Sequence, residues 1–586
     1  MSLGQHAFGR SSLPRWLGER VWGLEHAFER ARASGKVEDD TRLRIFFVLV
    51  LFALGFLSLA AGATRSALFS DARAVGMAPP QGAARADLVD RNGRLLAADL
   101  LHYGLYIDPR EIWDTGETRR RLLAALPALD PERLERALRG HRRVFVIGAL
   151  TPDERNGVNG LGLPGVTFEP EKRRIYPLGP TAAHLIGFSD TGGEGLAGVE
   201  AAFNDDIREA AQGPDPVPLS IDLRIQGALE DELWKAVAEF RPKGAVGVVA
   251  DVHTGEILGM TSWPTFNPNE AGRASNEQRL DRAAASVFEM GSTFKAFTVA
   301  IGLDTGVATP ESTFDATTPL KLGYRTITDY HATHAVLNLV EVFQHSSNIG
   351  TARLAERVGP ERMGQYFDRL GLTSPAKIEL IESARPLTPR KWDEDAIASV
   401  SFGHGINVTP LALTRAYLSL LNGGELLPLT VHKLPAGAKV KGPRVVSEKT
   451  SLQMLSIMRA NVTGGSGRSA NIEGLYVGGK TGTGDKWDPA ARRYSTTKQV
   501  SSFAAVFPTT GDLNTRRYFV LVLMDEPGRG HLGVDPTGGI AAAPAVGRVI
   551  ERIAPFVGVR RQPAGVAQVV PVEQPPEDEA AAGADR

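Results

Sequence analysis

The 586-residue chain contains no cysteine, so it can form neither a disulfide nor a thiolate metal site. It also lacks an excess of charge of either sign, because 66 lysines and arginines stand against 67 aspartates and glutamates. The basic residues are spread along the chain, which argues against nucleic-acid binding. The remaining composition, 42% hydrophobic and 23% charged, is typical of a globular protein long enough for several domains.

Long uncharged stretches are scarce as well, and one of 19 residues, IFFVLVLFALGFLSLAAGA, runs from Ile45 to Ala63. A helix of that length can cross a bilayer. The small residues at its end resemble a signal-peptide cleavage site, but the 44 residues before it are too many for a signal peptide. We therefore predict a single transmembrane anchor over 45–64. The lysines and arginines that precede it predict a cytoplasmic tail over 1–44, with the rest of the chain outside the membrane.

The residues after the anchor divide into a linker and a first domain. Small residues, glycine and proline predict a linker over 65–84. In the region 85–240, RADLVDRNGRLLAADL has the pattern of two short strands around the turn RNG, whereas PERLERALRG and IDLRIQGALEDELWKAV have helical spacing. This mixture predicts an α+β domain.

A second domain is predicted over 241–560. It begins with a hairpin, because two β-branched runs in GAVGVVADVHTGEILGMTS flank the turn HTG. Near its end, QVSSFAAVFP and RYFVLVLMDEP are typical of buried strands, and GGIAAAPAVGRVIERIAPFVG predicts a final helix despite Pro544. Strands from both ends of one domain can share a sheet. The tail over 561–586, rich in alanine, proline and glutamate, is predicted to be disordered.

Two polar motifs of the second domain carry candidate chemistry. In FEMGSTFKAF, Ser292 precedes Lys295 by three residues at the head of an apolar run. On a helix these side chains share a face, which places a nucleophile beside a candidate base. In FQHSSNIGTARLAERVG, Ser346 and Asn348 stand before a helical run, where both residue types also serve as ordinary N-caps.

The third motif is Lys480-Thr481-Gly482-Thr483 in LYVGGKTGTGDKW, which follows the start of an apolar strand. A phosphate-binding loop would need a glycine spacing upstream of Lys480 that is missing here, so the nucleotide interpretation fails. Each motif alone is weak evidence. Their order and context in one chain make coincidence remote.

This ordered set resembles the penicillin-binding proteins and serine β-lactamases. RADLVDRNGRLLA resembles the box that opens the pedestal of class B penicillin-binding proteins, and YPLGPTAAHLIGFSDTGGEGLAGVE resembles their second pedestal signature. SFGHGINVTPLALTRAYLSLLNGG is similar to the segment between their second and third motifs, so the likeness covers roughly residues 85–558. Met290 replaces the usual proline and Ala86 the usual glycine, and neither change removes a chemical group from the site.

The resemblance implies an α+β pedestal followed by an α/β transpeptidase domain, in which helices flank an antiparallel sheet. It implies that Ser292 attacks a D-Ala-D-Ala carbonyl to form an acyl-enzyme. A serine hydroxyl is a poor nucleophile, and Lys295 can take its proton only as a neutral amine. Burial and a second cation both favour that form. Lys480 would supply the cation and attract the terminal carboxylate of the substrate.

The other motif residues receive roles by the same resemblance. Ser346 would relay a proton to the departing D-alanine, and Asn348 would bind the backbone of the donor peptide. The backbone N–H groups of Ser292 and Thr483 would stabilise the oxyanion. The Thr481 and Thr483 hydroxyls would hold the substrate, and Gly482 would leave room for it. No metal or organic cofactor is implied.

Finer similarity indicates the division-specific members of the class. VFEMGSTFKAFTVAIGLDTGVATPESTFDATTPL and VEVFQHSSNIGTA look most like septal transpeptidases. That implies stem peptides of peptidoglycan as substrates and β-lactams as inhibitors. It also implies a bacterial inner-membrane location with a periplasmic catalytic domain. Because no long glycosyltransferase-like region lies between the anchor and the pedestal, chain polymerisation would need a membrane-embedded glycosyltransferase as a partner, together with other division proteins.

Several alternatives stay open. A rod-elongation transpeptidase or a D,D-carboxypeptidase would carry the same motifs. A membrane-anchored β-lactamase or sensor would not need a pedestal of about 150 residues. A non-catalytic scaffold would be expected to have lost part of the catalytic set. His331 and His334 lack a further ligand cluster in the sequence, so a surface or cleft-rim role is favoured over metal binding. His404 stands among glycines and could line the cleft, and we favour a structural role for it.

Overall fold

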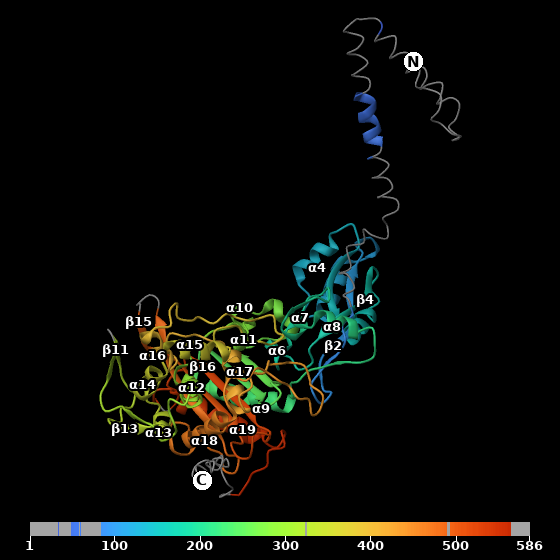
Figure 1. The fold of residues 1–586 in the computed structure, drawn as a ribbon. Helices are drawn as coiled ribbons and strands as arrows, with labels where there is room; N and C mark the ends of the chain where they lie inside the picture. The colour runs from blue at the N-terminus through green and yellow to red at the C-terminus, as the bar shows by residue number, and fades with distance from the viewer. Residues whose placement is uncertain are drawn as a thin grey trace, which may run out of the picture. The chain divides into compact units, whose positions relative to one another are not determined.

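The computed structural model describes residues 33, 48–57, 59, 84–322, 325–488, 493–531 and 533–563 (Figure 1). Contacts divide the chain into two compact units. One contains Met1–Ala78 and Gly104–Glu169, and the other contains Pro79–Tyr103 and Pro170–Arg586. Residues 170–240, which the sequence pattern groups with the first domain, thus share a unit with the catalytic region.

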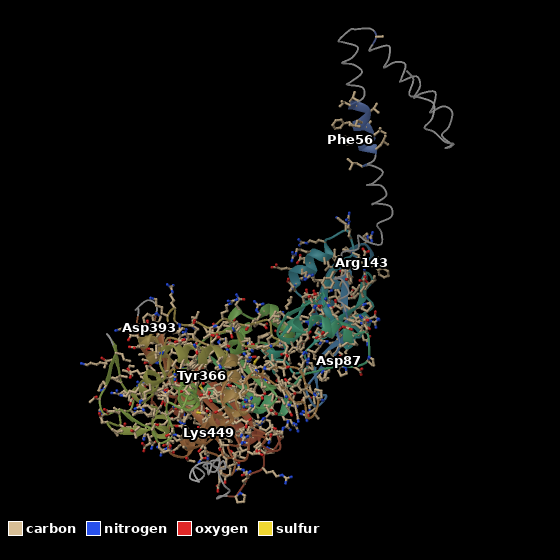
Figure 2. The ribbon with its side chains drawn as sticks, viewed as in Figure 1. Phe56, Asp87, Arg143, Tyr366, Asp393 and Lys449 are labelled. Atoms are coloured by element: carbon tan, nitrogen blue, oxygen red, sulfur yellow. The ribbon has the colours of Figure 1, made fainter. Side chains whose placement is uncertain are left out.

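The predicted anchor over 45–64 lies partly outside the described residues, which cover 48–57 and 59 of it. Those described are helical, and their apolar side chains, Phe56 among them, are exposed (Figure 2). Within the described part of the chain, no helix is both long and apolar enough to span a membrane. The predicted cytoplasmic tail, linker and C-terminal tail lie almost wholly outside the described residues.

The smaller unit is a mixed α/β body. Its elements are the end of β2 (Leu95–Ile107), η1 (Pro109–Glu111), α3 (Thr115–Ala125), α4 (Pro131–Leu138), β3 (Val144–Leu150), α5 (Pro152–Asn159) and the start of β4 (Val166–Ile175). Side chains of Asp114, Asp130 and Thr151 cap the three α-helices by accepting hydrogen bonds from first-turn N–H groups. The guanidinium of Arg143, which Figure 2 labels, lies 4.3 Å from the centre of the Tyr106 ring.

The two predicted strands around the turn RNG are present. β1 (Leu88–Val89) pairs antiparallel with β2 and parallel with β7 (Val217–Pro218). The short elements that follow β4 are α6 (Ala183–Ile186), β5 (Phe188–Ser189), β6 (Gly195–Ala197), α7 (Gly198–Ala202) and α8 (Asn204–Ala210). A buried ion pair between Arg85 and Glu200, 2.6 Å apart, joins the two pedestal signatures.

The catalytic region is built on a five-stranded sheet in the order β14-β15-β16-β8-β9, with every pair antiparallel. The strands are β8 (Gly244–Asp251), β9 (Ile257–Trp263), β14 (Gly478–Asp488), β15 (Arg493–Phe507) and β16 (Tyr518–Asp525). The predicted hairpin is therefore β8–β9, and strands from both ends of the domain do share one sheet. The expected antiparallel sheet is confirmed.

Alternating side chains of β16 enter two separate cores, as the period of a strand requires. Phe519 and Leu521 pack on one face with α12 (Lys295–Asp304), α14 (Asn348–Val358), α17 (Pro410–Leu421) and α18 (Glu448–Gly464). Val520 and Val522 pack on the other with α9 (Leu223–Phe240) and α19 (Ala543–Ile553). Helices thus flank both faces of the sheet.

The final helix tolerates its proline because of where that proline lies. α19 begins at Ala543, directly after the π-helical segment η5, so Pro544 lies in its first turn, a position that proline commonly occupies. The remaining elements of this unit are η2 (Pro268–Arg273), α10 (Asn276–Arg279), α11 (Arg282–Ala285), η3 (Gly291–Phe294), β10 (Thr313–Asp315), β11 (Leu320–Leu322), β12 (Arg325–Ile327), β13 (Val336–Asn338), α13 (Leu339–Gln344), α15 (Pro360–Arg369), α16 (Glu394–Val400), η4 (Arg468–Ala470) and η5 (Gly538–Ala542).

Candidate active site

Ser292 lies in a single 3-10 turn, η3, directly before α12. The predicted helix start is therefore present, with a tighter first turn than an α-helix. Gly291 has φ = +54°, a backbone conformation that glycine adopts without strain. A Cβ there would lie 2.5 Å from the Thr483 carbonyl oxygen, so this glycine brings η3 close against β14.

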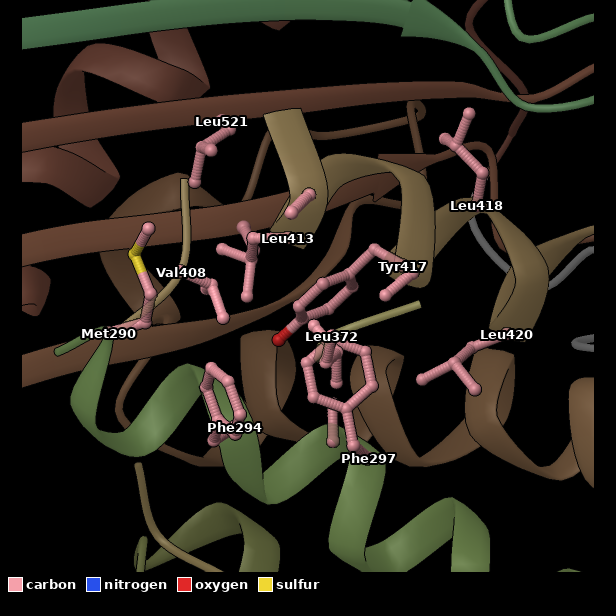
Figure 3. Packing of buried hydrophobic residues seen from close by; sticks show 14 of the residues in the cluster. Met290, Phe294, Phe297, Leu372, Val408, Leu413, Tyr417, Leu418, Leu420 and Leu521 are labelled. Atoms are coloured by element: carbon pink, nitrogen blue, oxygen red, sulfur yellow. The ribbon is translucent and has the colours of Figure 1, made fainter. Parts of the chain in front are cut away.

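The turn rests on a buried aromatic cluster (Figure 3). Phe294 and Phe297 are fully buried beneath it, and the Tyr417 ring of α17 packs edge-on to Phe297 at 5.1 Å. The Tyr417 hydroxyl donates a 2.6 Å hydrogen bond to the carbonyl oxygen of Thr293, the residue after the nucleophile. The backbone that carries Ser292 is thereby fixed from below.

Lys295 is fully buried, and its amine points to the second motif. Its Nζ donates to the Ser346 carbonyl oxygen, to Ser346 Oγ at 3.1 Å and to Asn348 Oδ1 at 2.7 Å. Burial lowers the pKa of Lys295 to about 7, although the carboxylate of Asp329 acts in the opposite direction. A neutral amine is therefore accessible near neutral pH.

The Ser292 hydroxyl has no hydrogen-bond partner among the described residues, and Ser292 is half-buried at the edge of a cavity. The contact between nucleophile and base expected from their spacing is thus not formed in this state. Such contacts are often long without substrate and shorten only in the reacting complex.

The three consecutive residues of the second motif, Ser346, Ser347 and Asn348, have different partners. Ser347 is the N-cap of α14 and accepts a hydrogen bond from the Gly350 N–H. The capping role that a sequence of this kind suggests is therefore met by Ser347, which leaves Ser346 and Asn348 free for other partners. Ser346 has φ = +57°, an uncommon conformation for a serine and one that is concentrated at functional sites.

Asp329 holds this motif in place, and sequence reasoning missed it. One carboxylate oxygen accepts from Ser347 Oγ at 2.7 Å and the other from the Ile349 N–H at 3.0 Å. The adjacent Thr328 carbonyl oxygen accepts from Asn348 Nδ2 at 2.9 Å. Asp329 lies two residues before His331 and carries no motif of its own in the sequence.

Lys480 is the second fully buried lysine of the site. Its Nζ donates to Ser346 Oγ at 2.9 Å and lies 5.6 Å from the centre of the Phe343 ring. Burial, followed by the charge of Lys295, moves the pKa of Lys480 well below its ordinary value. Ser346 Oγ therefore contacts both amines. Protonation of both at once would place two buried positive charges close together, which is unfavourable.

Two threonines of the third motif are anchored from opposite sides. Thr481 Oγ1 lies 2.6 Å from Ser466 Oγ, which in turn donates to Asn461 Oδ1 at 3.2 Å. Thr483 Oγ1 accepts from the Gly538 N–H at 3.1 Å. Ser466 and Asn461 carry no motif in the sequence, so only the fold could place them here.

The space that a Cβ at Gly482 would occupy is already filled by protein atoms. A Cβ at this position would lie 2.3 Å from Ser502 Oγ and 2.6 Å from the Met290 carbonyl oxygen. The glycine thus allows η3 and β15 to approach β14. This contact accounts for the glycine without any contribution from a substrate.

A cavity of about 510 Å³ brings the motifs together. Its lining includes Ser292, Ser346, Asn348, Thr481, Thr483, Tyr330, His331, Phe402, His404, Ser466 and Arg468. The buried amines of Lys295 and Lys480 reach it through their contacts with Ser346.

The histidines quoted from the sequence lie at different places. His331 and His404 line the cavity, and His404 also stacks on Tyr494 with ring centres 5.2 Å apart. His334 does not line it, and its Nδ1 lies 3.1 Å from the Thr317 carbonyl oxygen. In the part of the chain that is described, no group of three or more histidines and carboxylates could hold a metal ion.

Comparison with known proteins adds to this geometry. Residues 245–551 match the penicillin binding protein transpeptidase domain, and residues 80–208 match the penicillin-binding protein dimerisation domain. The chain is 65% identical to the "Probable peptidoglycan D,D-transpeptidase FtsI" of Caulobacter vibrioides, over 94% of this chain and 95% of the relative. It is 30% identical to the peptidoglycan D,D-transpeptidase FtsI of Escherichia coli, over 80% and 82%. It is 27% identical to stage V sporulation protein D of Bacillus subtilis, over 88% and 84%.

Proposed function

This chain belongs to the penicillin-binding proteins that join a dimerisation domain to a transpeptidase domain, and we propose that it cross-links peptidoglycan stem peptides through an acyl-enzyme on Ser292. It is a serine D-Ala-D-Ala transpeptidase, and β-lactams bind to its catalytic domain. The observation that carries the residue assignment is the position of Ser346 Oγ between two buried amines at the wall of a cavity that Ser292 also lines.

In the acylation step, Lys295 takes the proton of the Ser292 hydroxyl. Its pKa near 7 leaves a substantial fraction of neutral amine at neutral pH, which an ordinary lysine would not have. Ser292 Oγ then attacks the carbonyl carbon of the penultimate D-alanine. The N–H groups of Ser292 and Thr483 stabilise the oxyanion, because Gly291 and Gly482 bring η3 against β14.

Expulsion of D-alanine requires a proton on the departing nitrogen. Ser346 is suited to this relay because its hydroxyl contacts both amines, so a proton taken by Lys295 can pass through Ser346 Oγ. Lys480 and Thr481 lie on the β14 side and hold the terminal carboxylate of the donor. That carboxylate would raise the pKa of Lys480, and the resulting cation would favour a neutral Lys295.

Asn348 binds the donor peptide, and Thr483 lines the same cavity and contacts the same substrate. In the second half-reaction, the primary amine of a neighbouring stem peptide displaces Ser292 and forms the cross-link. Hydrolysis of the acyl-enzyme would make the protein a D,D-carboxypeptidase instead. The aminolysis pathway is the one that the family activity requires.

The cellular role rests on the relatives named FtsI and on the hydrophobic segment over 45–64. We place the protein in septal wall synthesis, anchored in the inner membrane by that segment, with the catalytic domain in the periplasm. A membrane-embedded glycosyltransferase and other division proteins would be its partners. Depletion in a rod-shaped host should give filaments, whereas rounded cells would indicate a role in elongation.

The test of the chemistry is intact-protein mass spectrometry of wild type and Ser292→Ala after exposure to a penicillin. A stable penicilloyl adduct on wild type alone supports the assigned nucleophile. A D-Ala-D-Ala donor and an amine acceptor are then added, and a cross-linked peptide should form. Loss of the adduct within seconds would indicate a β-lactamase, and hydrolysis without cross-linking would indicate a carboxypeptidase.

A further inference from the structure

Two carboxylates away from the catalytic cavity each have one buried oxygen without a hydrogen-bond donor. Asp281, only 4% exposed, is the N-cap of α11, and its Oδ1 accepts from the Ala283 N–H at 2.9 Å and from Ser262 Oγ at 3.3 Å. Glu382 Oε1 accepts from the Gly198 N–H at 2.8 Å. The second oxygens, Asp281 Oδ2 and Glu382 Oε2, are buried and have no partner in the described structure. Buried acceptors normally have a donor, so both oxygens require one.

The fold brings these two carboxylates to one place. The Ala384 N–H donates to the Ala284 carbonyl oxygen at 3.0 Å, so the segment that carries Glu382 lies against α11, which begins directly after Asp281. Burial, followed by the charge of Glu382, raises the pKa of the Asp281 carboxyl to about 7. Two ionised carboxylates here would repel each other, whereas one proton between them would supply the missing donor.

Among the described residues, no cation is paired with either carboxylate. Burial lowers the pKa of His184 to about 4, so this side chain is neutral near pH 7. The other charged groups on the elements that pack here have partners of their own or are exposed. They are Arg282 on Glu277, Asp525 on Lys486, Glu200 on Arg85 and Arg174, Glu230 on the Ala182 N–H, Arg415 on the Leu427 carbonyl oxygen, Glu379 on Thr430 and the Val431 N–H, and the exposed Lys243, Lys377 and Arg385.

The pair joins the second pedestal signature to the support of the catalytic turn. Gly198 belongs to the end of that signature, GLAGVE. The segments that carry Asp281 and Glu382 continue to Phe288 and Leu387, which form backbone hydrogen bonds with two neighbouring residues, 408 and 407. Phe288 precedes η3 by three residues. The contact between Glu382 and Gly198 therefore connects the signature to the backbone that supports η3.

We propose that Asp281 and Glu382 share a single proton, and that this proton keeps Glu382 on the Gly198 N–H and so holds the second pedestal signature on the segment that leads to Ser292. The proton lies between Asp281 Oδ2 and Glu382 Oε2 and gives both buried oxygens a partner. When it is lost, the two negative charges repel each other. Glu382 is half-buried and can turn toward water, whereas Asp281 is buried and cannot, so the contact with Gly198 opens. This pH-sensitive switch does not depend on the proposed function.

The direction of the pH effect follows from the raised pKa. With the contact closed, the pair holds its proton up to about pH 7. Once Glu382 turns away and water enters, the like charge is gone and the pKa of Asp281 falls. Opening thus releases a proton, so a rise in pH favours the open contact until the closed form has also lost its proton. A difference of about one pKa unit between the two forms gives a change of about tenfold in the opening constant.

Hydrogen–deuterium exchange of the full chain in detergent tests the switch. The readout is the protection factor of a peptide that contains the Gly198 amide, corrected for the intrinsic effect of pH on exchange. It should fall about tenfold in wild type between pH 5.5 and 8. Asp281→Asn and Glu382→Gln each replace the shared proton with a permanent amide donor, so their protection should change less than about twofold. Asparagine is also a good N-cap, so α11 should keep its start.

Asp222→Asn is the matched control, because Asp222 is also a buried N-cap but pairs with Arg224 at 2.5 Å. It should keep the wild-type fall in Gly198 protection. Protection that is constant with pH in wild type would overturn the shared proton, and so would a full fall in Asp281→Asn and Glu382→Gln. If one of these two variants fails to fold, the other decides by the same criterion. Loss of the pH dependence in Asp222→Asn would also overturn the proposal, because the effect would then not come from the pair.

Discussion

The hydroxyl of Tyr417 donates a 2.6 Å hydrogen bond to the carbonyl oxygen of Thr293 from within the hydrophobic core (Figure 3). Thr293 follows the nucleophile, so this bond connects α17 to the turn that aims Ser292. Tyr417→Phe keeps the ring and removes the bond. It should lower the free energy of unfolding by about 1–2 kcal/mol and slow acylation by penicillin several-fold. Chemical denaturation and acylation kinetics measure the two effects.

Tyr366→Phe is the control for that variant. The Tyr366 hydroxyl donates a bond of the same length, 2.6 Å, to Asp304 at the far end of α12 (Figure 2 labels Tyr366). This variant should lose stability without slower acylation. If both variants slow acylation equally, Tyr417 acts only through global stability.

The pH dependence of acylation should report Lys295. Its pKa is lowered to about 7, and the amine can accept a proton only when it is neutral, which is the state above that pKa. The second-order rate constant for penicillin should therefore rise between pH 5.5 and 8 and level off above. Lys295→Arg should lose roughly 100-fold or more, because a guanidinium cannot be deprotonated. A rate that is flat or falls with pH would remove Lys295 from the role of base.

Much of the fold could be predicted from the sequence because its signals are local. Apolar, β-branched runs predicted the hairpin β8–β9, apolar runs typical of buried strands predicted β15 and β16, and helical spacing predicted α4, α9 and α19. The spacing from Ser292 to Lys295 required only one turn of helix. The three motifs could be recognised because each is contiguous in the chain.

The remaining features depend on contacts between distant residues, which no local pattern encodes. Asp329, Asn461 and Ser466 enter the site from loops and from α18, and nothing in their own segments marks them. Residues 170–240 share a unit with the catalytic region through contacts such as the stacking of Phe203 on His432, with ring centres 4.0 Å apart. Phe203 and His432 are 229 residues apart, whereas Asp329 and Ser347 are only 18 apart but lie in different segments, so no single local pattern contains both members of either pair.

Burial of the Lys480 amine should lower the free energy of unfolding, although acylation needs this lysine. It is fully buried, and its folded pKa is below the ordinary value, so the folded protein binds fewer protons than the unfolded chain. Stability of the wild type should therefore rise as pH increases toward about 10, where the unfolded lysine also loses its proton. Lys480→Met should stabilise the protein by about 0.5–2 kcal/mol at pH 7.5 and abolish acylation.

The advantage of Lys480→Met should shrink as pH rises, which denaturation at pH 7.5 and 9.5 would show. Lys449→Met, at an exposed position of α18 (Figure 2), is the control and should change stability by less than about 0.5 kcal/mol. A destabilised Lys480→Met would mean that its hydrogen bonds outweigh the cost of burial.

Atoms of Ser502 and Met290 lie where a side chain at position 482 would begin, so a substitution of Gly482 should destabilise the protein. Gly482→Ala would place a Cβ 2.6 Å from the Met290 carbonyl oxygen and should lower the free energy of unfolding by about 1–3 kcal/mol while it displaces η3. Acylation should slow with it. Gly227→Ala is the opposite case, because Gly227 is exposed within α9 and a Cβ added there would enter open space. That variant should gain about 0.5–1 kcal/mol, and thermal unfolding would compare the two.

Asp329 should set the position of the pH profile. Its carboxylate is the charge that raises the pKa of Lys295 against the effect of burial. Asp329→Asn removes the charge but keeps an oxygen to accept from Ser347 or from the Ile349 N–H. The ammonium form of Lys295 then loses its stabilising anion, so its pKa should fall further, and the rise in acylation rate should move to lower pH.

Measurement of the acylation midpoint in Asp329→Asn tests this directly, with Asp393→Asn as the control. Asp393 caps α16 and is not among the charges that act on Lys295 (Figure 2 labels Asp393). Its variant should keep the wild-type midpoint. A midpoint that moves to higher pH in Asp329→Asn would mean that the loss of order around Ser347 matters more than charge. Loss of the Asp329 charge must change the pKa of Lys295. An unmoved midpoint would therefore mean that a group other than Lys295 limits acylation.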